Sequence, residues 1–172
     1  MGKLEEALVN RLLEASPNYK QNDMEQTIRQ LLGAQPFTDV TGLPPRRGKA
    51  DGGFDGQMTV SHLVDQSWQE TLAGLNVKVR IDSFSRGDLA LFILDMDREK
   101  IDLGFIITAA YLSPDAKVEL QRKNDEGNIT LFHLRLSDIL SNTFNLPTIQ
   151  IQGQSLNTVL TDNLQSLLKE IQ

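Results

Sequence analysis

Two stretches of the sequence carry side chains that could hold a metal ion between them. Residues 48–56, GKADGGFDG, are dense in glycine and deliver one acid, Asp55, at the start of an apolar-alternating run. Residues 75–82, LNVKVRID, alternate apolar and polar residues, as a strand with one buried face does. The polar face of this expected strand carries Asn76, Lys78, Arg80 and Asp82. An acid beside such a row suits Mg²⁺, which takes one or two carboxylates and keeps its waters.

The chemistry that this pairing offers is water attack on a phosphodiester. A divalent metal can activate a water and stabilise the leaving oxygen, and a nearby lysine can orient or deprotonate that water or offset charge on the phosphate. Other chemistries are poorly supplied. The two histidines, His62 and His133, lie in or beside strand patterns, where we expect structural or surface roles. Cysteine is absent, and no GxGxxG or Walker spacing supports a nucleotide site.

Length and composition indicate a soluble globular chain. A chain of 172 residues, 40% hydrophobic and 23% charged, suggests one domain with a sizeable core. We expect a cytoplasmic protein without a membrane span, since the sequence has no long apolar run, no signal-peptide core at its start and no cysteine. The net charge of −6 argues against a generally basic surface, but it leaves room for a local basic cleft.

Helical and strand patterns place the candidate residues on regular elements. Glu25 falls in the first turn of an expected helix that begins at Asn22 or Asp23 and ends at Gly33. The other elements expected before residue 82 are a helix over 3–15, a strand over 37–41, a loop over 42–53, a strand over 54–60 and the strand over 75–82. Residues 61–71 are ambiguous, and fit either a connecting loop or a helical turn around Trp68.

The second half of the chain alternates helices and strands. Its expected elements are a helix over 85–100, a buried strand over 103–108, a helix starting at 113 and leading into 116–121, a turn over 124–127, a strand over 128–134, a helical segment starting at 137–140, an edge strand over 148–152 and a terminal helix over 155–171. This order predicts an α/β fold with a central mixed β-sheet flanked by helices.

Several of these motifs, taken together, resemble one nuclease family. ADGGFDG, the strand carrying NVK and the run SRGDLALFILDMDREKIDLGFIITA resemble the Mrr-like branch of the PD-(D/E)xK nuclease superfamily. MEQTIRQLL is similar to that family's first core helix, including its acid. The resemblance covers about residues 22–142. It implies a restriction-endonuclease-like core within a single domain of residues 1–172, to which the helices over 3–15 and 155–171 are additions.

The resemblance also implies roles for individual residues. Asp55 matches the family's metal-binding aspartate, and Glu25 matches the first-helix acid that helps to order the metal or its water. Lys78 matches the lysine of the (D/E/Q)xK motif and Asn76 its first position. Asn76 is a departure, because an amide supplies a neutral oxygen where the family has a carboxylate or a glutamine. That change would weaken the metal site.

A second register remains open. Arg80 and Asp82 could occupy the two motif positions instead, in which case the lysine is lost and the site is dead or rearranged. Both registers place their residues on the same strand face, so periodicity does not choose between them. We favour Asn76 with Lys78 because that register keeps the lysine.

The sequence therefore supports two functions on one fold. The first is a metal-dependent deoxyribonuclease of restriction type that uses Mg²⁺, with Mn²⁺ as an alternative, acts on DNA and forms a homodimer to cut both strands. The second is a catalytically inactive member of the fold that binds DNA or protein. Arg46, Arg47 and Lys49 could contact phosphate or form a solvated basic loop. Structural roles also stay open for Asp55 as a turn residue, Glu25 as a helix-start acid and Lys78 as an edge charge.

Overall fold

A six-stranded mixed sheet organises the chain, seen in a computed structural model that describes residues 3–14, 23–37 and 54–171. The strands are β1 (Gly56–Val64), β2 (Ser67–Lys78), β3 (Leu103–Thr108), β4 (Thr130–Arg135), β5 (Ile149–Ile151) and β6 (Gln154–Ser155). The helices are α1 (Lys3–Leu13), α2 (Met24–Leu32), α3 (Arg86–Glu99), α4 (Pro114–Glu126), α5 (Leu136–Ser141) and α6 (Leu156–Ile171). The expected alternation of helices and strands in the second half is confirmed.

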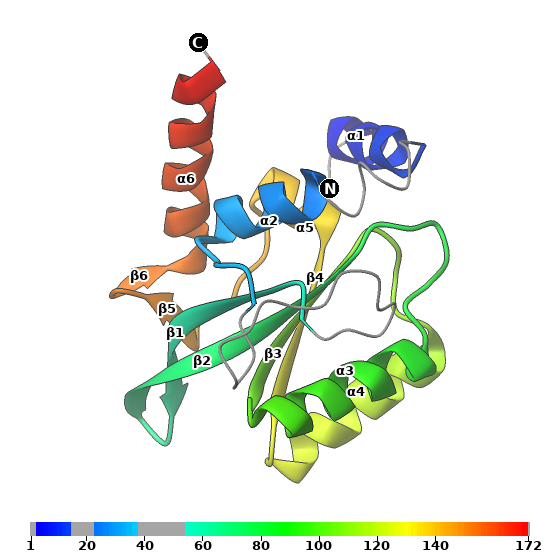
Figure 1. Ribbon diagram of the computed structural model, residues 1–172, viewed down its shortest axis with the longest axis vertical. Coiled ribbons are helices and arrows are strands. Elements are labelled where there is room, and N and C mark those ends of the chain that lie inside the picture. The colour runs from blue at the N-terminus through cyan, green and yellow to red at the C-terminus, as the bar shows by residue number, and fades with distance from the viewer. Residues whose placement is uncertain (1–2, 15–22, 38–53, 172) are drawn as a thin grey trace.

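The sheet has the strand order β4-β3-β2-β1-β5-β6 and two kinds of pairing. β2, β3 and β4 run parallel and are joined through α3 and α4. β1 pairs antiparallel with β2 and with β5, and β5 pairs antiparallel with β6. α3 and α4 lie side by side on one face, and α2 and α5 lie on the other (Figure 1). This arrangement confirms the predicted mixed sheet flanked by helices.

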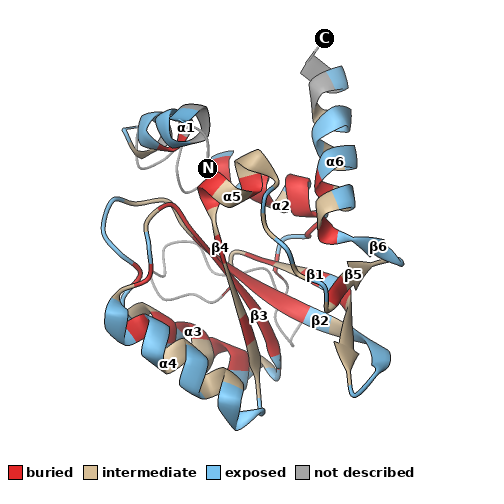
Figure 2. Ribbon diagram, turned by 180° about the vertical axis from the view of Figure 1, so that it is seen from behind, coloured by how far each residue is buried: buried red, intermediate tan, exposed pale blue. Residues whose placement is uncertain are grey.

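Apolar packing on both faces explains why the parallel strands are buried. Every residue of β3 is buried, as its near-continuous apolar sequence LGFIIT predicts. The buried residues of these strands are red in Figure 2. On the face covered by α3, Gly104 lets the helix approach closely, because a Cβ there would lie 2.7 Å from a ring carbon of Phe92. On the opposite face, Phe105 packs in the core that also buries Ile28 of α2. The sheet is therefore fixed from both sides.

Polar caps set the starts of the two crossover helices. Ser85 and Asp88 form a capping box at the start of α3, in which each side chain accepts from the other residue's backbone N–H. Ser113 caps α4 by accepting a hydrogen bond from the N–H of Ala116. α4 runs to Glu126 and ends at Gly127, whose φ is 79°. The expected turn over 124–127 is therefore mostly helix, and only its last residue terminates the element.

The ambiguous stretch between the first two strands is a β-hairpin, so neither the loop nor the helical turn expected over residues 61–71 forms. β1 starts at Gly56 and continues to Val64, and β2 begins at Ser67, so Trp68 is a strand residue. Asp65 and Gln66 connect the strands with φ values of 49° and 65°. Two left-handed residues suit a tight hairpin, but this turn lacks the glycine that usually signals one.

Three strand boundaries also differ from expectation. β2 ends at Lys78, opposite the last residue of β3, instead of running to Asp82. Phe37 is not in a strand, although Gln35 forms an isolated bridge with Gln57; residues 38–41 lie outside the described part of the chain. β5 is not the edge that we expected, because the short β6 pairs with it. In the described residues, no helix has the length and apolar character needed to cross a membrane.

Candidate functional site

Asp55 is held in place at the point where β1 begins beside the end of β2. Its backbone N–H donates to the carbonyl of Leu75 at 2.8 Å, and its Oδ2 accepts from the backbone N–H of Val77 at 2.7 Å. The preceding Phe54 is buried edge-on against Phe92, with ring centres 5.5 Å apart. The aspartate is therefore anchored by main-chain bonds and by a buried neighbour, and its carboxylate is partly buried.

Arg29 of α2 adds a further anchor that the sequence reasoning missed. Its Nη1 donates to the backbone carbonyl of Asp55 at 2.8 Å. A side chain at position 56 would crowd this contact, since a Cβ there would lie 2.9 Å from Cδ of Arg29 and 3.1 Å from Cδ1 of Leu75. The sequence did contain a signal: Arg29 follows Glu25 by four residues, so both side chains project from one face of the same helix.

Glu25 and Asp55 form a pair of acids that resist ionisation. Burial, then the negative charge of Asp55, raises the pKa of Glu25 to about 7, while Arg29 and Lys78 act in the opposite direction. Burial also raises the pKa of Asp55 above its ordinary value, against the bond from Val77 and the two cations. A bound cation would favour the ionised form of both carboxyl groups and so offset the cost of their burial.

Asn76 and Lys78 project from the same face of β2 beside Asp55. Asn76 is only 8% exposed, and its Oδ1 has no hydrogen-bond partner. A buried amide oxygen without a partner carries a desolvation cost and invites an external ligand. Lys78 lies close enough to Glu25 and Asp55 to lower the pKa of both acids. The structure thus brings the two residues of the favoured register, Asn76 and Lys78, together with Glu25 and Asp55.

The residues of the other register lie elsewhere. Arg80 is past the end of β2, and its guanidinium forms an ion pair with Asp88 of the α3 capping box. Asp82 is exposed in the connection to α3. Arg46, Arg47 and Lys49 lie outside the described residues, so their expected phosphate contact is not described.

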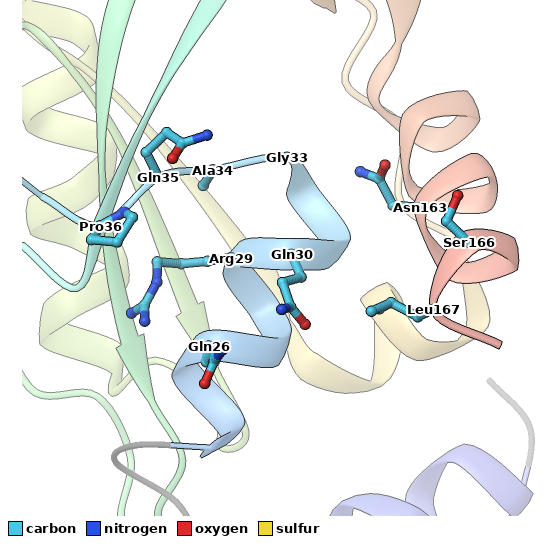
Figure 3. Close-up of a pocket in the computed structure, with 10 residues that line it drawn as sticks. All are labelled: Gln26, Arg29, Gln30, Gly33, Ala34, Gln35, Pro36, Asn163, Ser166 and Leu167. Atoms are coloured by element: carbon cyan, nitrogen blue, oxygen red, sulfur yellow. The ribbon is translucent and has the colours of Figure 1, made fainter. Parts of the chain in front are cut away.

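A pocket of about 460 Å³, lined by polar and apolar residues that include Arg29, lies between α2 and α6 (Figure 3). Gln30 points across it toward Leu167, whereas Arg29 points away from α6. Asn163 of α6 donates to the carbonyl of Leu31 at 3.0 Å and so joins the two helices. Neither Glu25 nor Asp55 lines this pocket, so it is distinct from the acid pair.

The donor atoms fit a hard divalent cation with water completing its shell. Glu25 and Asp55 supply carboxylates, and Asn76 supplies an amide oxygen without a partner. Magnesium is commonly held by one or two carboxylates together with waters. In the described residues, no group of three or more histidine, aspartate or glutamate side chains is placed to hold a metal. A site here would therefore depend on two acids, the amide and water.

Two solved structures with a similar fold are restriction endonucleases. The chain aligns with a DNA modification-dependent restriction endonuclease, AspBHI, at a TM-score of 0.52 and 17% identity, covering 96% of this chain and 41% of that one. It aligns with the MspJI restriction endonuclease in complex with a 27-mer oligonucleotide at a TM-score of 0.50 and 14% identity, covering 95% and 36%. The chain therefore spans well under half of either neighbour, and the likeness shows the fold, a restriction-endonuclease-like α/β core.

Family membership rests on the sequence itself. No curated protein matches the chain. The family model Mrr_cat, described as a restriction endonuclease, matches residues 18–136, which is most of the chain and includes Glu25, Asp55 and β2. The expected Mrr-like resemblance is thus confirmed, and the chain belongs to the Mrr_cat restriction endonuclease family.

Proposed function

We propose that this chain is a metal-dependent endodeoxyribonuclease of restriction type whose active site consists of Glu25, Asp55, Asn76 and Lys78. The observation that carries the proposal is the acid pair with raised pKa values, set beside a lysine and an amide oxygen that has no partner. A structural acid is usually satisfied by its neighbours, whereas functional groups often have strongly perturbed pKa values.

In this proposal each side chain has one task. Asp55 and Glu25 hold the metal, with the Asn76 oxygen assisting directly or through water. When bound, Mg²⁺ or Mn²⁺ supplies Lewis-acid activation of a water and stabilisation of the leaving oxygen. Lys78 orients the attacking water and offsets charge on the phosphate. Arg29 keeps the main chain of Asp55 in position.

DNA is the proposed substrate because of the family and because one structural neighbour is a complex with an oligonucleotide. Cutting both strands of a duplex requires two active sites, so we propose a homodimer as the cleaving form. Phosphate contacts from the expected basic residues Arg46, Arg47 and Lys49 belong to the same proposal.

The test is nicking of supercoiled plasmid with Mg²⁺ and then Mn²⁺, comparing the wild type with Asp55→Asn. The substitution keeps the shape and an oxygen that can accept from Val77, but it removes the charge that holds the metal. We expect metal-dependent nicking by the wild type and at least a hundredfold loss in the variant. Nicking that survives Asp55→Asn would refute the proposed site. The matched control is Asp97→Asn, an exposed acid on α3, which we expect to retain full activity.

Asn76 favours a second candidate, a DNA-binding member of the fold that has lost catalysis. The asparagine stands where an active relative would have a carboxylate or glutamine; its amide is neutral, unlike a carboxylate, and its side chain is one methylene shorter than that of a glutamine. Calorimetry with Mg²⁺ and DNA-binding titration separate the two functions. DNA binding without metal binding or nicking supports the inactive subunit, whereas metal binding that requires Asp55 supports the nuclease.

A further inference from the structure

Two loops lie side by side beyond the carboxyl ends of β2 and β3, residues 79–85 and 109–113 (Figures 1 and 2). The backbone N–H of Phe84 donates to the carbonyl of Tyr111 at 3.1 Å, and the N–H of Ser113 donates to the carbonyl of Phe84 at 2.9 Å. A bridge between Phe84 and Leu112 joins them further. These bonds hold the two loops together as one surface at the end of the sheet where the proposed active site lies.

Cationic side chains continue from the active site along this edge. Lys78, Thr108 and Arg135 lie opposite one another in β2, β3 and β4. Paired residues in neighbouring strands point to the same face, and two strand spacings put Arg135 about 10 Å from Lys78. The Arg135 guanidinium lies 3.8 Å from the centre of the Tyr111 ring, and the Lys117 ammonium lies 5.9 Å from it. The Tyr111 ring therefore contacts two cationic groups, those of Arg135 and Lys117.

Large apolar and aromatic side chains are exposed on the two loops. Tyr111 is 58% exposed, and Ile81 of the neighbouring loop is 77% exposed. The chain as a whole carries a net charge of −6, so a cluster of cations at one edge differs in sign from the net charge of the chain. Burial, then the charge of Arg135, lowers the pKa of His133 to about 4, with Lys117 acting in the same direction and Asp138 opposing. Arg135 and Lys117 thus both act on His133 as positive charges, beside the larger effect of burial and against the opposing charge of Asp138.

We propose that a strand-end surface, defined as Ile81, Tyr111, Lys117 and Arg135, binds the DNA backbone beside the phosphodiester that the active site holds. The inference rests on the proposed function for the position of that phosphodiester. Arginine, lysine and tyrosine are typical phosphate ligands, and an exposed ring can also stack on a base or sugar. Successive nucleotides of one strand advance about 3.4 Å along the duplex. A span of about 10 Å therefore reaches a phosphate within about three nucleotides of the cleaved bond.

The experiment measures binding separately from cleavage. A fluorescein-labelled DNA duplex is titrated with protein by fluorescence anisotropy at several salt concentrations, in the Asp55→Asn background so that the probe stays intact. Lys117→Gln is expected to reduce the slope of log affinity against log salt by about 0.9, since one phosphate contact is lost. Tyr111→Ala is expected to weaken binding about tenfold, whereas Tyr111→Phe keeps the ring and most of the affinity.

Lys123→Gln is the matched control, because it removes the same charge from the last turn of the same helix, α4. Its affinity and salt slope are expected to equal those of the parent. Unchanged binding in both Lys117→Gln and Tyr111→Ala overturns the inference, as does a parent protein that does not bind the duplex. If the variants weaken binding although the wild type never nicks plasmid, the inference stands and the proposed function fails. If the wild type nicks plasmid and the variants bind the duplex as the parent does, the proposed function stands and the inference fails.

Discussion

Two aspartates near the end of β2 are treated in opposite ways by the protein. Asp88 accepts hydrogen bonds from the backbone and hydroxyl of Ser85 and pairs with Arg80. Burial would raise the pKa of Asp88, but these partners outweigh it, and the pKa is lowered. Asp55 has one backbone donor, Val77, and burial raises its pKa against that bond and against the charges of Lys78 and Arg29.

The contrast separates a structural acid from the acids of the proposed active site. The Asp88 carboxylate is satisfied by partners that the fold supplies, and it holds α3 in place. The Asp55 and Glu25 carboxylates lack full compensation, which costs stability and leaves them able to bind a cation. Proteins commonly accept such a cost at functional sites. The following changes test whether the two regions differ as the electrostatics indicate.

The largest contrast is expected between Lys78→Met and Arg80→Met, two cations only two residues apart. Lys78→Met should lower plasmid nicking by about 10²–10⁴-fold, because it removes the group that orients water. Arg80→Met should leave nicking within a few-fold and lower the free energy of unfolding by about 1 kcal/mol, because it removes the Asp88 ion pair. Nicking rates and urea denaturation measure both. Equal losses of activity would reject Asn76 with Lys78 as the motif.

The same pair shows where sequence reasoning stops. The alternation of residues 75–82 continues past Lys78, so the sequence alone predicts a strand to Asp82. The strand ends earlier because β3, its parallel partner, ends opposite Lys78 and the chain then turns to cap α3. The end of β2 is therefore set by a tertiary contact, the pairing with β3, and residues 75–82 carry no local signal of it. The end of the strand places Arg80 with Asp88 instead of with the acid pair.

The hairpin and Arg29 show two further kinds of limit. The mixed sheet and the helices around β3 followed from apolar runs and caps, which are local. The hairpin over 56–78 was hidden because its turn residues, Asp65 and Gln66, lack the usual glycine. Arg29 was visible as a residue one turn after Glu25, but its bond to Asp55 joins segments 26 residues apart. Acid types at motif positions were predictable, and their partners were not.

A second contrast compares the stabilities of Asp88→Asn and Asp55→Asn without metal. Asp88→Asn should lower the free energy of unfolding by about 2 kcal/mol, since an amide weakens both the capping box and the ion pair. Asp55→Asn should be neutral or stabilising, since it relieves repulsion from Glu25 and its oxygen can still accept from Val77. Urea denaturation in a chelating buffer measures both. A loss at Asp55 as large as that at Asp88 would make Asp55 a structural acid.

A third change, Asn76→Asp, sharpens the comparison by adding a charge at the partnerless amide oxygen. The side chains are nearly the same size, so packing is preserved while a third carboxylate joins the acid pair. We expect Mg²⁺ affinity to rise about tenfold, equivalent to about 1.4 kcal/mol, and the metal-free protein to become less stable. Calorimetry and melting curves with and without Mg²⁺ measure this. Unchanged affinity would place Asn76 outside the metal site.

The smallest effect is expected at His133, where burial acts on a base. The His133 Nε2 lies 2.7 Å from the hydroxyl of Thr108, and its pKa falls from 6.5 to about 4. Between these values the unfolded chain binds a proton that the folded protein does not, so His133 makes stability fall as pH drops. Glu25 has the opposite sign, because its raised pKa lets the folded protein keep a proton as pH drops below about 7.

Replacing His133 with glutamine removes the contribution that lowers stability as pH drops and leaves that of Glu25. The full shift corresponds to about 3 kcal/mol at most, and partial contact of the ring with water reduces it to about 1 kcal/mol. We expect urea denaturation of His133→Gln at pH 7, 5.5 and 4.5 to show about 1 kcal/mol less acid destabilisation than the wild type. Adding Glu25→Gln should then remove the opposite contribution, the rise in the free energy of unfolding as pH falls, over the same pH range. Parallel pH profiles for wild type and His133→Gln would show that the histidine stays solvated, and that burial at this face of the sheet acts on the acid pair alone.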